Sequence, residues 1–99
     1  MPKIKEEIEV TEEIAPPSMY YVMLHNDDYT SMEFVVSILR TFFYKNQQEA
    51  EDIMIKIHKK GKAVCGLFSY EIARTKVYQV KTLAKQEDFP LLATIEKDV

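Results

Sequence analysis

Four polar residues of this chain could act together as hydrogen-bond acceptors. Asn26, Asp27 and Asp28 are consecutive, and His58 lies in a later helical segment. Carboxylates, an amide carbonyl and an imidazole nitrogen suit a cation rich in N–H groups, such as the free α-amine of a polypeptide. Each residue also has an ordinary structural interpretation. An Asn-Asp-Asp run is commonly a turn that favours the next helix N-terminus, and a histidine near a helix C-terminus commonly complements the helix dipole.

Apolar residues are predicted to lie beside these acceptors. Met32 and Val35 fall in the first turn of one predicted helix, and Met54 and Ile57 share a face near the end of the next. If the helices form an antiparallel hairpin, the four side chains line a hollow rimmed by the acceptors. Burying a Leu- or Phe-sized side chain contributes roughly 1.5–3 kcal/mol, and each hydrogen bond to an ammonium about 1.5–3 kcal/mol. A micromolar affinity is then attainable, unless these side chains simply belong to the core.

The remaining pattern predicts the elements that must position these residues. Alternating apolar and polar residues indicate strands, and apolar residues spaced three and four apart indicate helices. The predicted order is strand 19–26, helix 32–44, helix 47–60, strand 62–68, helix 70–87 and strand 91–96. This β-α-α-β-α-β order predicts an α+β fold, with a small three-stranded antiparallel sheet and three helices on one face.

Capping signals set the predicted helix ends. Thr30 and Glu33 are expected to form a capping box, in which the hydroxyl and the carboxylate each satisfy an amide of the first turn. Asn46 is the predicted cap of the second helix, and Gly61 ends that helix. Ser69 is in place to cap the third helix.

Charge excludes some partners. The net charge of −3 comes from the first fourteen residues, which hold five acids and two bases. The rest of the 99-residue chain carries eleven acids and eleven bases, so it lacks the basic surface that nucleic acid requires. Residues 1–14 have no aromatic residue and are followed by Ala-Pro-Pro. We therefore expect a flexible acidic N-terminal extension over residues 1–17 and a folded core over residues 18–99.

Cysteine content and hydropathy indicate a location. No apolar run approaches the roughly 18 residues needed to span a bilayer, and the first residues do not have the pattern of a signal peptide. Cys65 has no second cysteine for an internal disulfide and is predicted to be a buried small hydrophobe. We expect a cytoplasmic protein that does not bind membranes.

Enzymatic interpretations are weak. His25, Asp27, Asp28 and His58 have none of the spacings typical of a preformed metal site. A Cys65–His58 nucleophile pair has no third group to orient it. The sequence has no glycine-rich phosphate loop. We therefore expect no catalytic residues, no metal and no cofactor.

Several separated motifs, in the right order, resemble those of the ClpS adaptor family. They are Pro-Pro-Ser-Met-Tyr at 16–20, Asn-Asp-Asp-Tyr-Thr-Ser-Met-Glu-Phe-Val at 26–35, Ile-His-Lys-Lys-Gly-Lys-Ala-Val-Cys-Gly at 57–66, Glu-Ile-Ala-Arg-Thr-Lys-Val at 71–77 and Phe-Pro-Leu-Leu at 89–92. The likeness covers residues 16–97. It implies a fold similar to the C-terminal domain of the ribosomal stalk protein. It also implies an adaptor that binds substrates whose first residue is Leu, Phe, Tyr or Trp and delivers them to the AAA+ unfoldase of the Clp protease, ClpA in many bacteria.

The resemblance assigns roles in substrate binding to residues at matching positions. Three residues would contact the substrate α-amine: Asn26, Asp27 and His58. Asp28 would support the loop, and Thr30 would line the site. Met32 would exclude β-branched first side chains, and the rest of the pocket wall would be Val35, Met54, Ile57 and Leu91. Ile57 stands where many members have valine, which slightly alters the pocket volume.

The resemblance also implies how the partner protein is bound. Glu71 and Lys76 match the positions that dock on the N-terminal domain of the unfoldase, with Tyr29 joining them. Residues 1–15 would be the tail that the unfoldase engages during delivery. The expected protein is a monomer whose partners are substrates bearing such N-degrons and a ClpA-like unfoldase.

One alternative is an interaction module of similar fold that has no specificity for a peptide N-terminus. The predicted helix 32–44 is apolar over more than half its circumference, so it could bind a partner helix instead. Acetylating the ligand's amine distinguishes the two hypotheses, because acetylation removes the ammonium. A metal-dependent enzyme, the other alternative, predicts stoichiometric metal in the purified protein.

Overall fold

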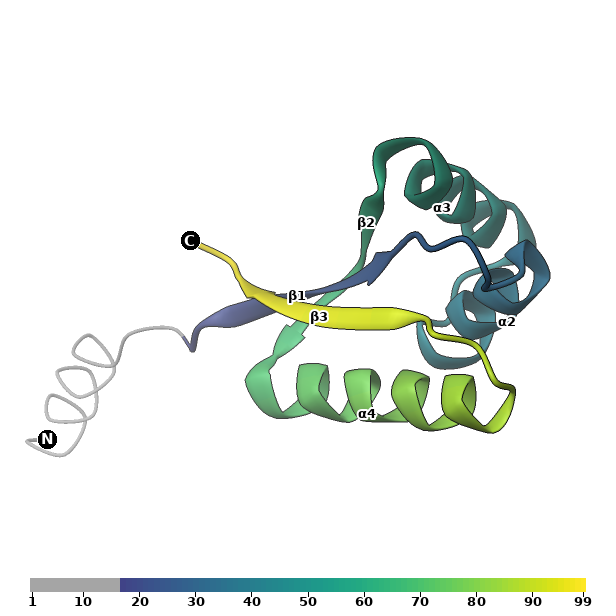
Figure 1. Ribbon diagram of the computed structural model, residues 1–99. Helices are drawn as coiled ribbons and strands as arrows, with labels where there is room; N and C mark the ends of the chain where they lie inside the picture. The colour runs from purple at the N-terminus through teal and green to yellow at the C-terminus, as the bar shows by residue number, and fades with distance from the viewer. Residues whose placement is uncertain (1–16) are drawn as a thin grey trace, which may run out of the picture.

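Three strands and three helices make up the part of the chain that the computed structural model describes, residues 17–99. Their bounds are β1 Met19–His25, α2 Met32–Phe42, α3 Gln47–Lys60, β2 Lys62–Ser69, α4 Tyr70–Gln86 and β3 Leu92–Lys97. The predicted element order and the α+β class are confirmed (Figure 1). The predicted extension 1–17 lies, except for Pro17, outside the described residues, so the division into extension and core stays a prediction.

The sheet is antiparallel throughout, with β1 in the middle of the order β2-β1-β3. One face of β1 carries Val22 and Leu24, both without exposed surface, as the alternating pattern predicts. The pairing of β1 with β2 shifts after Val22, which pairs with Gly66, whereas the next residue, Met23, pairs with Val64. Cys65 is the extra residue of this bulge, and it is 2% exposed, which confirms its prediction as a buried small hydrophobe.

A single core joins this face of the sheet to all three helices. Its fully or almost fully buried helical side chains are Ile38 and Leu39 from α2, Ala50 and Ile57 from α3, and Ala73, Val80 and Ala84 from α4. Helix α4 runs along the strands, while α2 and α3 lie side by side at one end of the sheet (Figure 1). The predicted arrangement, with the helices on one face, is therefore confirmed.

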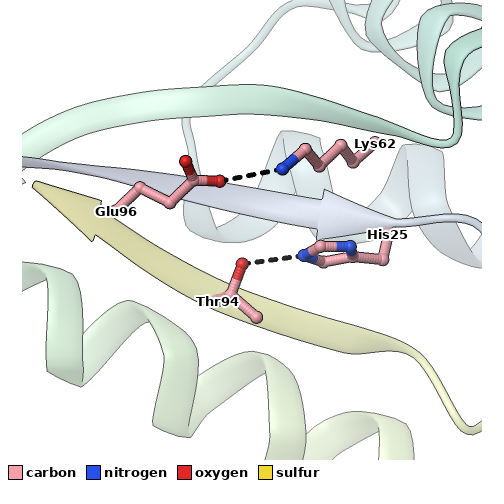
Figure 2. A network of polar contacts seen from close by, with 4 residues as sticks. All are labelled: His25, Lys62, Thr94 and Glu96. Atoms are coloured by element: carbon pink, nitrogen blue, oxygen red, sulfur yellow. Dashed lines mark hydrogen bonds and ion pairs between the residues drawn. The ribbon is translucent and has the colours of Figure 1, made fainter.

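The opposite face of the sheet is held by two polar contacts between strands, which Figure 2 shows. His25 Nε2 and Thr94 Oγ1 are 2.7 Å apart, and Lys62 Nζ lies 3.2 Å from Glu96 Oε2. Both side chains of the ion pair are about half exposed, so we expect it to contribute less than about 1 kcal/mol. No helix within residues 17–99 is long and apolar enough to cross a membrane.

The helix ends correct one prediction about capping. Ser31, and not Thr30, caps α2, because the Ser31 hydroxyl accepts a hydrogen bond from the Phe34 amide at 3.1 Å. The predicted Asn46 cap of α3 is confirmed, and it forms a capping box, since Asn46 and Glu49 each accept a hydrogen bond from the other's backbone amide. Ser69 occupies the cap position of α4, but its side chain makes no capping hydrogen bond.

Helix α2 also ends two residues earlier than predicted. The prediction extended this helix to Tyr44, but the last helical residue is Phe42. Tyr44 has a φ of 55°, in the left-handed region that cannot continue a right-handed helix. A single residue in this conformation turns the chain toward α3.

Candidate functional site

A cleft of about 230 Å³ lies between the loop that follows β1 and the facing ends of α2 and α3. Its lining consists of Asn26, Asp27, Asp28, Thr30, Met32, Val35, Met54, Ile57 and His58. The hollow and its acceptor rim, predicted from an antiparallel pair of helices, therefore come together in the structure. Its volume is below the roughly 300–1,000 Å³ of sites for drug-sized ligands. The cleft thus has room for one side chain and the polar group attached to it.

The Asp27 carboxylate organises the loop. Its Oδ1 accepts hydrogen bonds from the amides of Tyr29 and Thr30, at 2.8 and 2.7 Å. Its Oδ2 accepts one from the Thr30 hydroxyl at 2.7 Å, which explains why Thr30 does not cap α2. A carboxylate has about four acceptor positions, so one position remains on Oδ2 after these three bonds. Because Asp27 lines the cleft, we expect this position to accept from a ligand there.

Asp27 is negatively charged at neutral pH. Partial burial by itself raises the pKa of this carboxyl, but the hydrogen bonds from Thr30 and Tyr29 outweigh it and hold the pKa below its ordinary value. The Asp27 carboxylate thus accepts three hydrogen bonds from within the loop. Asp28 is exposed at the edge of the cleft, and its predicted supporting role stays a prediction.

A backbone link fixes the loop to the end of α3. The Asn26 amide donates a hydrogen bond to the Gly61 carbonyl at 2.8 Å, and the Gly61 amide donates to the Ile57 carbonyl at 2.9 Å. Gly61 reaches both partners with a φ of 93°, a conformation that favours glycine. Because His58 lies in the last turn of α3, this link brings His58 beside the Asn26–Asp27 pair.

The apolar residues of the cleft differ in burial, with two buried in the core and two more exposed methionines. Val35 and Ile57 are 7% and 3% exposed and belong to the core, so they are both core residues and cleft residues. Met32 is 53% exposed, and Met54 is partly buried. Leu91, the fifth predicted wall residue, is 6% exposed within the core and is not among the residues that line the cleft.

The three predicted docking residues lie on two segments, Glu71 and Lys76 on α4 and Tyr29 in the loop before α2. The Lys76 ammonium lies 4.7 Å from the centre of the Tyr44 ring and 5.8 Å from that of Phe68, at the C-terminal end of α2. Glu71 is exposed in the first turn of α4. Tyr29, which is 78% exposed, precedes the N-terminal end of α2, a helix about 16 Å long.

Tyr44 was missed by the sequence prediction, which placed it inside a helix. It is 82% exposed and lies against Lys76. A tyrosine at the end of an apolar helix gives no sequence signal for this contact, because the left-handed turn that brings it beside α4 depends on tertiary packing.

The metal and cysteine interpretations can be compared with the described residues. Within residues 17–99, no group of three or more His, Cys, Asp or Glu side chains could hold a metal ion. Burial raises the pKa of the Cys65 thiol to about 12, so the thiolate needed for nucleophilic attack does not form at neutral pH.

A half-open cleft with an apolar floor and a rim of acceptors, carried on this sheet and its three helices, defines a small α+β binding domain. Comparison with known proteins places the domain among its relatives. A family model described as "ATP-dependent Clp protease adaptor protein ClpS" matches residues 15–94. The chain therefore belongs to the ClpS family of adaptor proteins of the ATP-dependent Clp protease.

Individual relatives agree with this family. The ATP-dependent Clp protease adapter protein ClpS of Shewanella loihica is 56% identical over 85 residues, which cover 86% of this chain and 83% of that protein. The structure of Agrobacterium tumefaciens ClpS2 bound to L-phenylalaninamide superposes with a TM-score of 0.81 at 37% sequence identity. The superposition covers 84% of this chain and all of the Agrobacterium ClpS2 chain, which confirms the fold.

Proposed function

We propose that this protein binds the free α-amine and the large apolar first side chain of substrate polypeptides, and delivers these substrates to the Clp unfoldase. The observation that carries the proposal is the free acceptor position on the charged Asp27 carboxylate, directly beside an apolar cleft that fits one side chain. An ammonium joined to a Leu, Phe, Tyr or Trp side chain is complementary to that combination.

The ligand of the solved relative supports this chemistry. L-phenylalaninamide carries a free α-amine, a phenyl side chain and an uncharged amide in place of the carboxylate, so it mimics the first residue of a peptide. In this chain, Asn26, Asp27 and His58 would receive the amine, and Asp28 and Thr30 would complete the loop around it. The first side chain would lie among Met32, Val35, Met54 and Ile57, with the buried Leu91 behind them.

Titration of fluorescent peptides tests the proposal. Peptides that begin with Phe or Leu are expected to bind with micromolar or tighter affinity, and their acetylated forms are expected to lose most of it. Acetylation removes the positive charge while keeping the side chain, so it isolates the contribution of the amine. Equal affinities for free and acetylated peptides would contradict amine recognition and would favour a general interaction module.

Delivery is proposed to use a separate surface. Glu71 and Lys76 on α4 would dock on the N-terminal domain of a ClpA-like unfoldase, with Tyr44 holding the Lys76 side chain in place. Replacing Lys76 by alanine should abolish complex formation with the unfoldase and leave peptide affinity unchanged. Removing residues 1–15 should likewise spare peptide binding but stop substrate degradation in a reconstituted Clp protease. If both functions survive the truncation, these residues have no role in delivery.

A further inference from the structure

A second, larger hollow runs along the surface between α2 and α3 and borders the cleft. Its volume is about 570 Å³, and we call it the α2–α3 groove. It is lined by Met32, Glu33, Val36, Ser37 and Arg40 from α2, and by Gln47, Glu51, Met54 and Ile55 from α3. Seven of these nine residues are absent from the cleft, so most of this surface has no part in the proposed amine site.

The groove has an apolar floor and one polar end. Met32 and Ile55 are 53% and 45% exposed, and Val36 and Met54 are partly buried against the core. At the far end, Arg40 Nη1 donates to Gln47 Oε1 at 2.9 Å, and Gln47 Nε2 donates to Glu51 Oε2 at 2.7 Å. The Arg40–Gln47 hydrogen bond joins α2 to α3 at this end, whereas the Gln47–Glu51 bond lies within α3. Polar side chains therefore line this end of the groove, and its apolar side chains lie toward the cleft.

The groove and the cleft share two walls, Met32 and Met54. A peptide whose first side chain lies in the cleft on one side of these methionines has the groove on their other side. An extended chain advances about 3.3 Å per residue and alternates its side chains, so residue three returns to the face used by residue one after about 6.6 Å. Methionine side chains adapt to neighbours of different shape, which suits a wall contacted from both sides.

We propose that the α2–α3 groove binds an apolar side chain from position two or three of the same substrate peptide, an inference that rests on the proposed function. The protein then recognises two apolar side chains, one in the cleft and one in the groove. The occupant is a segment of the substrate peptide because the groove shares Met32 and Met54 with the cleft and is lined by polar side chains at its other end. The affinity for an N-degron would therefore depend on residues beyond the first.

The test uses three peptides that all begin with Phe, with Ala-Ala, Leu-Ala or Ala-Leu at positions two and three. Each is titrated into the full-length protein, into Ile55→Ser and into Ile72→Ser. Ile55 lines the groove and not the cleft, whereas Ile72 is 50% exposed on α4 and serves as a matched control. Partial burial of one leucine predicts about fivefold to tenfold tighter binding, with the larger gain for Ala-Leu. The gain should disappear in Ile55→Ser and persist in Ile72→Ser.

The outcomes separate this inference from the proposed function. The groove proposal is wrong, while amine recognition stands, if the free peptides bind tightly but neither Leu-Ala nor Ala-Leu binds more tightly than Ala-Ala. It is equally wrong if the Ile55→Ser variant keeps the gain in affinity from leucine. If none of the free peptides binds more tightly than its acetylated form, the proposed function itself is wrong. Thermal unfolding of Ile55→Ser and Ile72→Ser, expected to match the unmodified protein, shows that both variants are folded.

Discussion

Replacing Asp27 by asparagine separates the two roles of this residue, shaping the loop and attracting the ligand's charge. The asparagine Oδ1 can still accept from the amides of Tyr29 and Thr30, whose nitrogens lie 2.8 and 2.7 Å from Asp27 Oδ1 in the unmodified protein. The Oδ2 atom becomes an NH₂ group, which cannot accept from a ligand ammonium. The variant therefore keeps most of the loop's hydrogen bonds but loses the charge and the free acceptor position.

The expected loss follows from the strength of a charged hydrogen bond. Such bonds contribute about 1.5–3 kcal/mol, and the partial exposure of Asp27 favours the lower end of that range. A loss of about 1.5 kcal/mol corresponds to roughly tenfold weaker binding of a peptide with a free α-amine. The Thr30 hydroxyl loses one partner, so the free energy of unfolding should fall by no more than about 1 kcal/mol.

The assay compares two ligands against two proteins. One ligand is a peptide that begins with Phe, and the other is the same peptide with 3-phenylpropionyl in its place, which lacks only the amine. Asp27→Asn should weaken binding of the first about tenfold and of the second less than twofold, because only the first can pair with the carboxylate. Equal weakening of both ligands would refute direct pairing and leave Asp27 a purely structural residue.

The pH dependence of the same ratio gives a second check. Hydrogen bonds hold the pKa of Asp27 below its ordinary value of 3.8, so the carboxylate stays charged as the pH falls to that value and is protonated only below it. The stabilising charge is present above this range and is lost as the pH falls through the lowered pKa. The ligand's α-amine has an ordinary pKa of about 7.7–8.0 and stays protonated below about pH 6.5. The ratio of wild-type to Asp27→Asn affinity should therefore be constant from about pH 6.5 to pH 5, and a ratio that changes within this range would show that another group is responsible.

Three further predictions concern single positions. Gly61→Ala should lower the melting temperature by roughly 5–10 °C, because alanine disfavours a φ of 93°. The added Cβ would meet no atom within 4 Å, so the loss would come from the backbone conformation and not from a clash. An unchanged melting curve would mean that the backbone at Gly61 relaxes freely. Met32→Ala should admit peptides that begin with Val or Ile, measured by titration beside a Leu peptide, and unchanged discrimination would place the selectivity elsewhere. Cys65 should react with a thiol reagent about a hundredfold more slowly in the folded protein at pH 8 than in guanidinium, because it is 2% exposed and its pKa is raised to about 12; comparable rates would contradict its burial.

The fold was predictable because its signals are local and repeated. Val22 and Leu24 point to one face of β1 and are fully buried, whereas Tyr21, Met23 and His25 point to the other face, where Met23 is also only 8% exposed. The spacing of Ala73, Val80 and Ala84 places one side of α4 against the sheet. Each pattern is read within one element, so an error at one residue does not change the order of elements.

The ends of the elements were less predictable, because they depend on which of several equivalent groups forms a bond. Thr30 and Ser31 both offer a hydroxyl ahead of α2. In the structure the Thr30 hydroxyl donates to the Asp27 carboxylate, and the Ser31 hydroxyl caps α2 by accepting from the Phe34 amide. Sequence spacing alone fits either choice, since the decision rests on the three-dimensional shape of the loop.

The structural and the functional interpretations of the Asn-Asp-Asp run are not true alternatives. Asp27 behaves as a turn residue, because its two oxygens accept hydrogen bonds from Tyr29 and Thr30, two and three residues further on. The same bonds hold the carboxylate in one orientation and keep its charge, so a ligand amine would meet an acceptor that is already ordered. A free aspartate side chain on a mobile loop would lose conformational entropy when it paired with a ligand. The turn therefore makes the proposed binding stronger, and the energy that shapes the loop also prepares the site.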